Sequence, residues 1–231
     1  MDKSPQHIAF ILDGNRRWAV AHNLPILSGH SKGYDTAKFI IPLLPKYGVK
    51  YATFYTFSTE NWRRSTEEVD YLMNIFHDSF CDANGFMMKN NIKVVMIGDL
   101  EKLPPNILEK ARYIEDLTKN NTLITVMLAV SYGGRDEVIR AIKKLVQDKV
   151  EQKIDMEDIT EERFASYLDT NGFPYPDAMV RTSEKRISNF LIWQSAYAEM
   201  FFLDKLWPDF NEDDLRGIIN EFLQRKRRYG K

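Results

Sequence analysis

The chain has 231 residues, of which 44% are hydrophobic, and its 32 lysines and arginines nearly balance its 33 aspartates and glutamates. This hydrophobic content suffices for one sizeable core, so we expect a single domain over residues 1–231. A formal net charge of −1 argues against a general nucleic-acid-binding protein, and a single cysteine excludes an intramolecular disulfide. No apolar stretch approaches the ~18–20 residues of a membrane span, and no signal-peptide core follows the N-terminus. We therefore expect a cytoplasmic protein with at most peripheral contact with the inner face of a membrane.

The first strong pattern along the chain is a short apolar run that ends in a polar turn. Residues 8–12 are continuously apolar, as in a strand that is buried on both faces. Asp13 ends the run, Gly14 and Asn15 favour a turn, and a helix is predicted from Arg17 onward. A strand, a turn and a helix N-terminus form an anion site, to which Arg16 and Arg17 add guanidinium groups.

Asp13 is unexpected at such a site, because a carboxylate repels a phosphate unless a cation lies between them. Mg²⁺ is the cation that commonly combines one or two carboxylates with substrate phosphate oxygens. The alternative is that Asp13 only caps the turn. The neighbouring arginines favour the phosphate interpretation.

Strand and helix patterns alternate along the chain. Strands are predicted over residues 8–12, 51–57, 92–97, 123–130, 178–182 and 200–206. Helices are predicted over residues 17–21, 31–46, 68–88, 105–119, 136–150, 161–169, 189–198 and 211–228, with a capping box at residues 65–68 and with Pro42 and Pro45 ending the second helix early. This alternation predicts an α/β fold with a central, mostly parallel six-stranded sheet flanked by helices.

Ligands of such sheets bind beyond the carboxyl ends of the strands, and four polar loops follow predicted strands. They span residues 13–18, 58–64, 132–135 and 181–189. The last packs three cations and three hydroxyls into nine residues, and Gly29-His30 offers a further donor before a helix. A single charged loop is usually a solvated turn. Several at one sheet edge indicate a site for more than one phosphate group.

Apolar side chains accompany these donors. The predicted helix over residues 68–88 carries Leu72, Ile75, Phe76, Phe80, Phe86, Met87 and Met88, and the strand over residues 51–57 is rich in aromatic residues. Helical spacing of this kind is typical of an ordinary core. Beside a phosphate-binding rim, however, an elongated apolar tunnel would suit an amphiphile whose head is a diphosphate.

Specific motifs within these segments are similar to those of the cis-prenyltransferases, most closely to the bacterial undecaprenyl diphosphate synthase type. They are Asp-Gly-Asn-x-Arg-Trp-Ala at residues 13–19, Phe-Ser-x-Glu-Asn-Trp at 57–62, Tyr-Gly-Gly-Arg at 132–135, and Arg-Ile-Ser-Asn-Phe at 186–190 followed by Trp193-Gln194 and Ala-Tyr-Ala-Glu at 196–199. The resemblance is collinear over about residues 7–228, essentially the whole chain.

The resemblance implies a transferase of isoprenoid biosynthesis. Such an enzyme condenses isopentenyl diphosphate repeatedly onto an allylic diphosphate, here expected to be farnesyl diphosphate, and forms cis double bonds. The expected product is a long polyprenyl diphosphate, undecaprenyl diphosphate for the lipid carrier of cell-wall synthesis. Mg²⁺ is the implied cofactor and a homodimer the implied assembly.

The resemblance also assigns roles to individual residues. Asp13 and Asn61 would be catalytic, and Asp13 and Glu199 would bind the metal. Substrate-binding roles fall on Gly14, Asn15, Arg16, Arg17, Trp18, His30, Ser58, Thr59, Glu60, Trp62, Arg64, Arg181, Arg186, Ile187 and Ser188. A neutral amide is a poor base, so we expect the released diphosphate to accept the proton and Asn61 to orient the homoallylic group.

Two other classes of protein remain open at this point. A non-catalytic subunit of a two-component prenyltransferase would keep the fold but usually loses the aspartate and the arginine loop, which are both present here. A phosphate-ester hydrolase that uses Asp13 as its nucleophile would need a general base, which the first loop lacks. The chain also departs from the family pattern, with Arg16 in place of a common glycine, Ile26 in place of an arginine, and a 181–189 loop one residue shorter.

Overall fold

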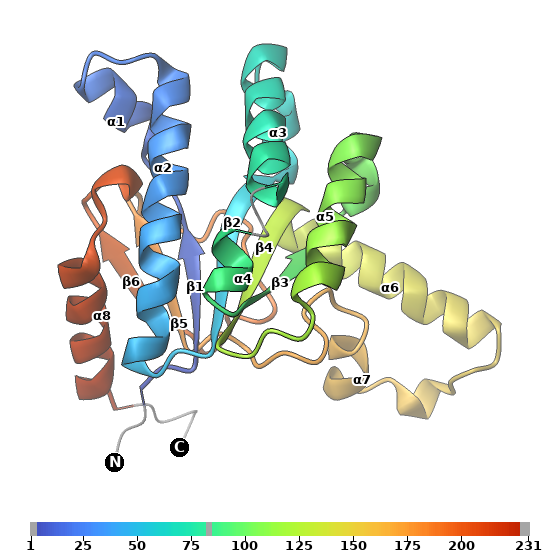
Figure 1. Ribbon diagram of the computed structural model, residues 1–231. Coiled ribbons are helices and arrows are strands. Elements are labelled where there is room, and N and C mark those ends of the chain that lie inside the picture. Colours follow the sequence, from blue (N-terminus) through green and yellow to red (C-terminus); the bar gives the residue numbers. More distant parts are fainter. Residues whose placement is uncertain (1–3, 82–84, 227–231) are drawn as a thin grey trace.

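The computed structural model describes residues 4–81 and 85–226, and its centre is one parallel β-sheet (Figure 1). The six strands are β1 (His7–Ile11), β2 (Tyr51–Ser58), β3 (Ile92–Ile97), β4 (Ile124–Tyr132), β5 (Ala178–Thr182) and β6 (Glu199–Leu203). Their order across the sheet is β3-β4-β2-β1-β5-β6, and every neighbouring pair is parallel. The predicted six-stranded sheet is confirmed, and it is parallel throughout.

The central strand β1 shows why the apolar run at residues 8–12 is continuous. Ile8 and Phe10 pack into the larger core cluster, whereas Ala9 and Ile11 pack into a second cluster that forms on the other face of the sheet. Successive side chains of a strand point to opposite faces, so a strand that is covered on both sides needs apolar residues at every position.

Helices cover the two faces unequally. The larger cluster is covered by α2 (Ile26–Ile40), η1 (Ile41–Tyr47), α3 (Thr66–Cys81), α4 (Phe86–Lys89), α5 (Pro105–Thr118) and α8 (Glu212–Gln224). The remaining helices are α1 (Asn15–Ala21), η2 (Thr59–Arg63), η4 (Leu100–Lys102), α6 (Gly134–Val150), η5 (Met156–Asp158), α7 (Glu161–Ala165) and η6 (Trp207–Asp209). None of the described helices combines the length and apolarity that crossing a bilayer requires.

The second face is covered mainly by an irregular segment, not by the helix predicted over residues 189–198. Phe190 and Leu191 in this segment are fully buried against the sheet. Asn189 and Leu191 have positive φ angles of 63° and 44°, and the Asn189 carbonyl accepts a hydrogen bond from the Gly134 N–H at 2.7 Å. Left-handed backbone and a carbonyl engaged outside the segment are both incompatible with an α-helix there.

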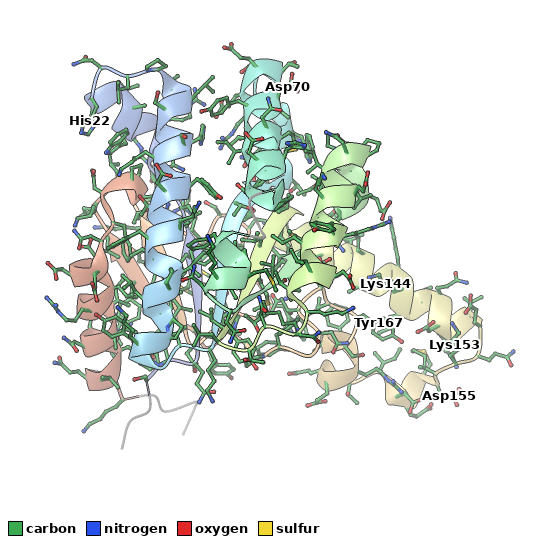
Figure 2. The ribbon with its side chains drawn as sticks, viewed as in Figure 1. His22, Asp70, Lys144, Lys153, Asp155 and Tyr167 are labelled. Carbon is green, nitrogen blue, oxygen red and sulfur yellow. The ribbon has the colours of Figure 1, made fainter. Side chains whose placement is uncertain are left out.

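The helices α6 and α7 extend away from the sheet (Figure 1). Their far end is held by polar contacts, in which the Tyr167 hydroxyl donates to Asp148 at 2.8 Å and the Lys153 ammonium lies 3.1 Å from the same carboxylate. Figure 2 shows Tyr167, Lys153 and Asp155 in this region, whereas His22 and Asp70 lie at the end of the molecule where α2 and α3 begin.

The second predicted helix begins five residues earlier than expected. Pro25 is the N-cap of α2. After Ile40 the helix is replaced by the 3₁₀ turn η1, which contains Pro42 and Pro45, so the prolines end the α-helix early as predicted. Gly29 and His30 therefore lie within α2 and do not precede it. A Cβ at Gly29 would meet the Asn15 carbonyl oxygen at 2.0 Å, so this glycine allows α1 to pack directly on α2.

The other boundaries differ by a few residues. Phe86 to Met88 belong to α4, separate from α3, and α7 ends at Ala165. β6 spans Glu199–Leu203, shifted toward the N-terminus from the predicted 200–206, and α8 ends at Gln224. The final residues of the last predicted helix, 227 and 228, lie outside the described part of the chain.

A buried histidine fixes the amino end of the central strands. His7 is 1% exposed, its Nδ1–H donates to the Pro174 carbonyl at 2.7 Å, and its Nε2 accepts from the Thr53 hydroxyl at 2.8 Å. Burial lowers the pKa of His7 to about 4, against the opposing effects of Pro174 and Asp177. The ring is therefore neutral in the folded protein at neutral pH.

This pKa predicts a pH-dependent stability. As pH is lowered from 6.5 to about 4, His7 becomes protonated in the unfolded chain but stays neutral in the folded protein. Proton binding therefore favours the unfolded state, and the free energy of unfolding falls across this pH range. The expected loss is roughly 3 kcal/mol. Urea unfolding at several pH values should show a shallower slope for His7→Gln, and the exposed-site control His22→Gln should follow the wild type. Equal slopes for all three proteins would contradict this assignment.

Candidate active site

A cavity of about 700 Å³ opens at the carboxyl edge of the sheet and continues between α2 and α3. Polar side chains line its mouth: Asp13, Asn15, His30, Ser58, Glu60, Asn61, Arg64, Arg181, Arg186, Ser188 and Asn189. Apolar side chains line its depth, chiefly Ile11, Leu12, Ala37, Ile41, Phe54, Leu72, Ile75, Phe76, Phe80, Met87 and Leu128. The predicted combination of a polar rim and an apolar tunnel is thus present in one continuous space.

The mouth is built around an ion pair between two adjacent strands. Asp13 follows β1, Arg181 lies in β5, and the Arg181 Nη2 donates to Asp13 Oδ2 at 2.7 Å. Arg181 is only 3% exposed, and its Nη1 also donates to the Arg186 carbonyl and to the Ser188 hydroxyl. Its buried Nε has no partner among the described residues. The pair therefore fixes a positive group and a carboxylate side by side at the rim.

More exposed cations surround this pair. Arg17 Nη2 lies 3.4 Å from Asp13 Oδ1, and Arg17 Nη1 lies 3.2 Å from Glu184. Arg186 also contacts Glu184, at 2.7 Å, and its side chain is 61% exposed. Contacts between exposed charged groups are weak, so both guanidinium groups can exchange Glu184 for an incoming phosphate.

The turn after β2 orients Asn61. The Ser58 N–H donates to Asn61 Oδ1 at 2.9 Å, and the Ser58 side chain accepts from the Asn61 backbone in return. This capping box uses the amide oxygen of Asn61, so the amide N–H groups are left to face a ligand. β2 contains an irregularity in its pairing with β4 just before this turn, between Tyr55 and Ser58. Bulges of this kind commonly redirect side chains at active sites.

A buried carboxylate joins the helices on either side of the mouth. Glu68 in α3 is 6% exposed and accepts from His30 Nε2 at 3.1 Å and from Arg64 Nη1 at 2.8 Å. Arg16 lies 3.5 Å away on the other carboxylate oxygen. Burial opposes ionisation of Glu68, but Arg64, His30 and Arg16 outweigh it, so its pKa is lowered. Burial lowers the pKa of His30, which donates as the neutral Nε2–H tautomer.

Loops from three strands meet beside the cavity. A Cβ on Gly133 would lie 2.6 Å from the Thr59 hydroxyl and 3.0 Å from Asn189 Nδ2, so glycine is required for this close approach. Asn189 donates to Glu60 at 3.1 Å and accepts from the Arg135 N–H at 2.9 Å. Burial opposes ionisation of Glu60, but hydrogen bonds from its own backbone and from the side chains of Asn189, Ser58 and Thr59 outweigh this effect, so its pKa is lowered. In the sequence, Asn189 begins a predicted helix and is part of the motif at residues 186–190, but it received no predicted role in the site.

Glu137 is a second residue that sequence reasoning missed. It is 1% exposed and accepts hydrogen bonds from the Tyr132 hydroxyl at 2.5 Å, from Gln194 Nε2 at 3.1 and 3.2 Å, and from the Asp169 N–H at 2.9 Å. Burial raises its pKa. These bonds join the end of β4 to the irregular segment that carries Asn189. The sequence feature that could have identified Glu137 is its position as a carboxylate in the first helical turn after Gly133-Gly134.

Several predicted residues lie outside the cavity lining. These are Gly14, Arg16, Arg17, Trp18, Thr59, Trp62, Ile187 and Glu199, together with the divergent Ile26. Trp18 donates to Asp209 at 2.7 Å and stacks on His22, and Trp62 donates to Ser131 at 3.0 Å and packs on Phe57. Both indoles thus hold the loops in place. Ile187 packs against the second core cluster.

Glu199 is the clear departure from the predicted metal site. It opens β6 opposite Ala178, which pairs with Ile8, so it lies at the amino end of the sheet. Asp13 is five residues beyond Ile8, roughly 16 Å along the strand direction at ~3.3 Å per residue. The Glu199 carboxylate instead contacts Arg225 at 2.8 Å. Within one chain, Asp13 and Glu199 are too far apart to bind the same ion.

The arrangement of the site indicates the class of protein. Guanidinium and amide donors gather at the carboxyl edge of a parallel sheet, and an apolar cavity begins directly beneath them. Arginine forks match phosphate oxygens, and the cavity can accept a hydrocarbon tail. The site is that of a protein which binds an amphiphile with a phosphorylated head.

Comparisons with known proteins agree with this class. A family model described as "Putative undecaprenyl diphosphate synthase" matches residues 11–230. An isoprenyl transferase of Clostridium perfringens is 44% identical over 230 residues, which cover 99% of this chain and 91% of that protein.

Two solved structures also share the fold over nearly their full length. Lavandulyl diphosphate synthase from Lavandula x intermedia, solved in complex with dimethylallyl diphosphate, has a TM-score of 0.95 at 34% identity and 99% coverage of both chains. A probable undecaprenyl diphosphate synthase from Campylobacter jejuni has a TM-score of 0.82 at 33% identity, with 100% coverage of both. The chain belongs to the undecaprenyl diphosphate synthase family and is a prenyltransferase of the cis-prenyltransferase type.

The Glu68 cluster yields a prediction about the stability of the mouth. Glu68→Gln removes the negative charge that three basic groups share, and we expect the free energy of unfolding to fall by about 2 kcal/mol. Denaturant unfolding measures the change. The neighbouring Glu67 is exposed, so Glu67→Gln should change stability by less than about 0.5 kcal/mol. Equal effects of the two substitutions would show that the cluster does not stabilise the fold.

Proposed function

We propose that the protein extends an allylic diphosphate by repeated cis-addition of isopentenyl diphosphate, with farnesyl diphosphate as the expected primer and a polyprenyl diphosphate of undecaprenyl length as the product. The observation that carries the proposal is the continuity of the Asp13–Arg181 rim with an apolar cavity of about 700 Å³. Such a product would serve as a lipid carrier for cell-wall synthesis. Peripheral contact with the cytoplasmic face of a membrane would allow this lipid to leave.

The polar rim offers places for two diphosphates. Asp13 lies in the turn after β1, and Asn15 and Arg17 lie in the first turn of α1, where the allylic diphosphate is expected. Arg181 lies near the end of β5, and Arg186 and Ser188 lie on the loop that follows it, where isopentenyl diphosphate is expected. The unpartnered Nε of Arg181 and the exposed head of Arg186 supply donors for this second group.

The donor set at Asp13 fits Mg²⁺ that is bound mainly by substrate. Mg²⁺ usually takes one or two carboxylates, with phosphate oxygens and waters as its other ligands. Asp13 lines the cavity, and its carboxylate is 28% exposed, so it can reach such an ion. When bound, the ion would add positive charge where the allylic diphosphate departs.

The residues around the reacting carbons act through charge and orientation. As the allylic C–O bond ionises, negative charge grows on the diphosphate, and the preorganised guanidinium groups bind it more strongly in the transition state. Asn61 cannot act as a base, because its amide oxygen already accepts from Ser58. The released diphosphate is then the acceptor of the proton, and the Asn61 N–H groups orient the homoallylic substrate.

A homodimer is the proposed assembly, and α6 supplies the supporting surface. Four apolar side chains, Ile139, Ile142, Val146 and Val150, are 42–71% exposed and recur at helical spacing on one face. The helix extends away from the sheet, so a second copy of the chain can pack along it (Figure 1).

Incubation with radiolabelled isopentenyl diphosphate, farnesyl diphosphate and Mg²⁺ tests the proposed reaction. Incorporation of label into products extractable in butanol would support the synthase. Release of inorganic phosphate without elongation would indicate a hydrolase, and absence of any turnover would indicate a non-catalytic subunit.

The role of Asp13 predicts a kinetic signature. Asp13→Ala should lower kcat by about a thousandfold or more, equivalent to ~4 kcal/mol, whereas KM for both substrates changes little, because the arginines still bind the diphosphates. Asp13→Asn tests the charge without changing the shape. Asp35→Ala, on the exposed side of α2, is the matched control. Wild-type turnover in either Asp13 variant would refute the assignment.

The α6 surface predicts the effect of charge on assembly. Ile142→Glu combined with Val146→Glu should convert a dimer to a monomer in sedimentation velocity experiments. Lys144→Glu places acid elsewhere on the same helix and should leave the dimer intact. A double variant that sediments like the wild type would place the interface elsewhere.

A further inference from the structure

Glu184 lies between two arginines that belong to different parts of the rim. One of its carboxylate oxygens is 3.2 Å from Arg17 Nη1, and the other is 2.7 Å from Arg186 Nη1. Arg17 lies in the first turn of α1, where the allylic diphosphate is expected, and Arg186 lies on the loop after β5, where isopentenyl diphosphate is expected. A single carboxylate, which received no role from the sequence, therefore neutralises cations of both diphosphate subsites.

A strained turn holds this carboxylate in place. Ser183 has a φ of 75°, and the Glu184 N–H donates to the Thr182 carbonyl, two residues earlier, at 2.9 Å. A γ-turn with positive φ is rare and strained. The Ser183 N–H donates to the Leu203 carbonyl of β6 at 2.7 Å, and the buried Ser183 hydroxyl has no hydrogen-bond partner among the described residues. Strain of this kind persists only where the surrounding contacts fix it, and it is concentrated at functional sites.

The Glu184 side chain can leave its position without leaving a buried charge. It is 32% exposed, and the side chains of Arg17 and Arg186 are 50% and 61% exposed. Exposed ion pairs contribute little each, and two of them favour the bridging arrangement over a solvent-facing one by roughly tenfold. Asp13 differs, because the buried Arg181 holds its carboxylate. Exposure thus allows Glu184 two arrangements, one that bridges the arginines and one that is released to solvent.

A diphosphate at either subsite favours the released arrangement. A phosphate beside Arg17 or Arg186 competes with the Glu184 carboxylate for the guanidinium group and repels that carboxylate. The diphosphate that binds first must displace Glu184, so its apparent affinity is reduced by the small fraction of enzyme that is already released. The second diphosphate then meets arginines that are free. Two ligands that favour the same state raise each other's affinity by the same factor.

We propose that Glu184 is a shared counter-ion that couples the two diphosphate subsites, so that each substrate raises the affinity for the other roughly tenfold. This inference rests on the proposed function, because it requires two diphosphates at the rim. In the free enzyme Glu184 bridges Arg17 and Arg186. In the complex with both substrates it faces solvent, and both guanidinium groups bind phosphate oxygens. Glu184 acts through these arginines and is therefore a positioning residue.

Isothermal titration calorimetry of the full chain with Mg²⁺ tests the coupling. The Kd of isopentenyl diphosphate is measured with and without saturating farnesyl thiodiphosphate, in which sulfur replaces the bridging oxygen and condensation is too slow to interfere. The ratio of the two Kd values should be roughly tenfold for wild type and less than about twofold for Glu184→Gln. In the absence of the allylic analogue, this variant should bind isopentenyl diphosphate more tightly than wild type does.

Asp204→Asn is the matched control. Asp204 is 88% exposed, and its carboxylate lies 3.4 Å from Lys185, the residue next to Glu184. Its substitution removes one negative charge beside the same loop but leaves the bridge between Arg17 and Arg186 intact. The ratio of Kd values should therefore match that of wild type. A ratio that falls equally in both variants would assign the effect to local charge in general and would overturn the proposal.

The other outcomes separate the coupling from the proposed function. A wild-type ratio of about one or less, with both ligands bound, would overturn the coupling and leave the site for two diphosphates intact. A wild-type ratio that persists in Glu184→Gln would overturn the role of Glu184, and a fixed repulsive charge would give this result with both Kd values lowered equally. Weaker binding of isopentenyl diphosphate by this variant would also overturn it. Failure of the wild type to bind either ligand would refute the proposed function, and the coupling with it.

Discussion

A buried guanidinium held by a neighbouring carboxylate organises the active site. Arg181 is almost completely buried, and burying a cation is unfavourable unless it is paired and hydrogen-bonded. Asp13, the Arg186 carbonyl and the Ser188 hydroxyl supply those partners. Because Asp13 follows β1 and Arg181 lies in the adjacent β5, the same contacts hold together the carboxyl ends of two central strands. The rim is thus rigid where it must bind charge.

Rigid and exchangeable charges are combined at this rim. The Asp13–Arg181 pair is fixed by burial, whereas Arg17 and Arg186 share the partly exposed Glu184 and can transfer to a phosphate. Preorganised donors stabilise a developing negative charge without reorganising during the reaction. The exposed Arg17 and Arg186 add donors that can move from Glu184 to a phosphate when substrate binds.

Beneath the rim, the cavity lies between α2 and α3, which are joined near its mouth by the Glu68 cluster. Glu68 links α3 to His30 of α2 and to Arg64 at the mouth. Below this cluster the apolar faces of the helices line a space of limited size. The fold is shared by a lavandulyl diphosphate synthase and a probable undecaprenyl diphosphate synthase, so the fold alone does not determine the product. Differences in product are therefore expected to arise from the side chains that line the cavity.

Local sequence patterns were sufficient to predict the strands of the sheet and most of the residues at the rim of the cavity. All six strands were predicted because β-branched and aromatic runs at residues 8–12, 51–57 and 92–97 leave little choice of secondary structure. Because ligands bind at the carboxyl edge of a parallel sheet, the same patterns predict that Asp13, Asn61 and Arg181 lie close together.

The remaining features depend on contacts between distant segments. The irregular backbone at Asn189 arises because its carbonyl and amide bind Gly134 and Arg135, and the helix pattern of that segment carries no trace of those partners. The hydrogen bonds of Glu68 and Glu137 likewise require partners from other elements, as do those of Trp18 with Asp209 and of Trp62 with Ser131. Glu199 follows the active-site loop closely in the sequence, but it lies at the start of β6 and therefore at the opposite end of the sheet. The sequence by itself determined which segments become strands and which chemical groups follow them, since both depend on local composition. Only the tertiary structure decided which of those groups share a cavity, because that depends on register and on the packing of helices against the sheet.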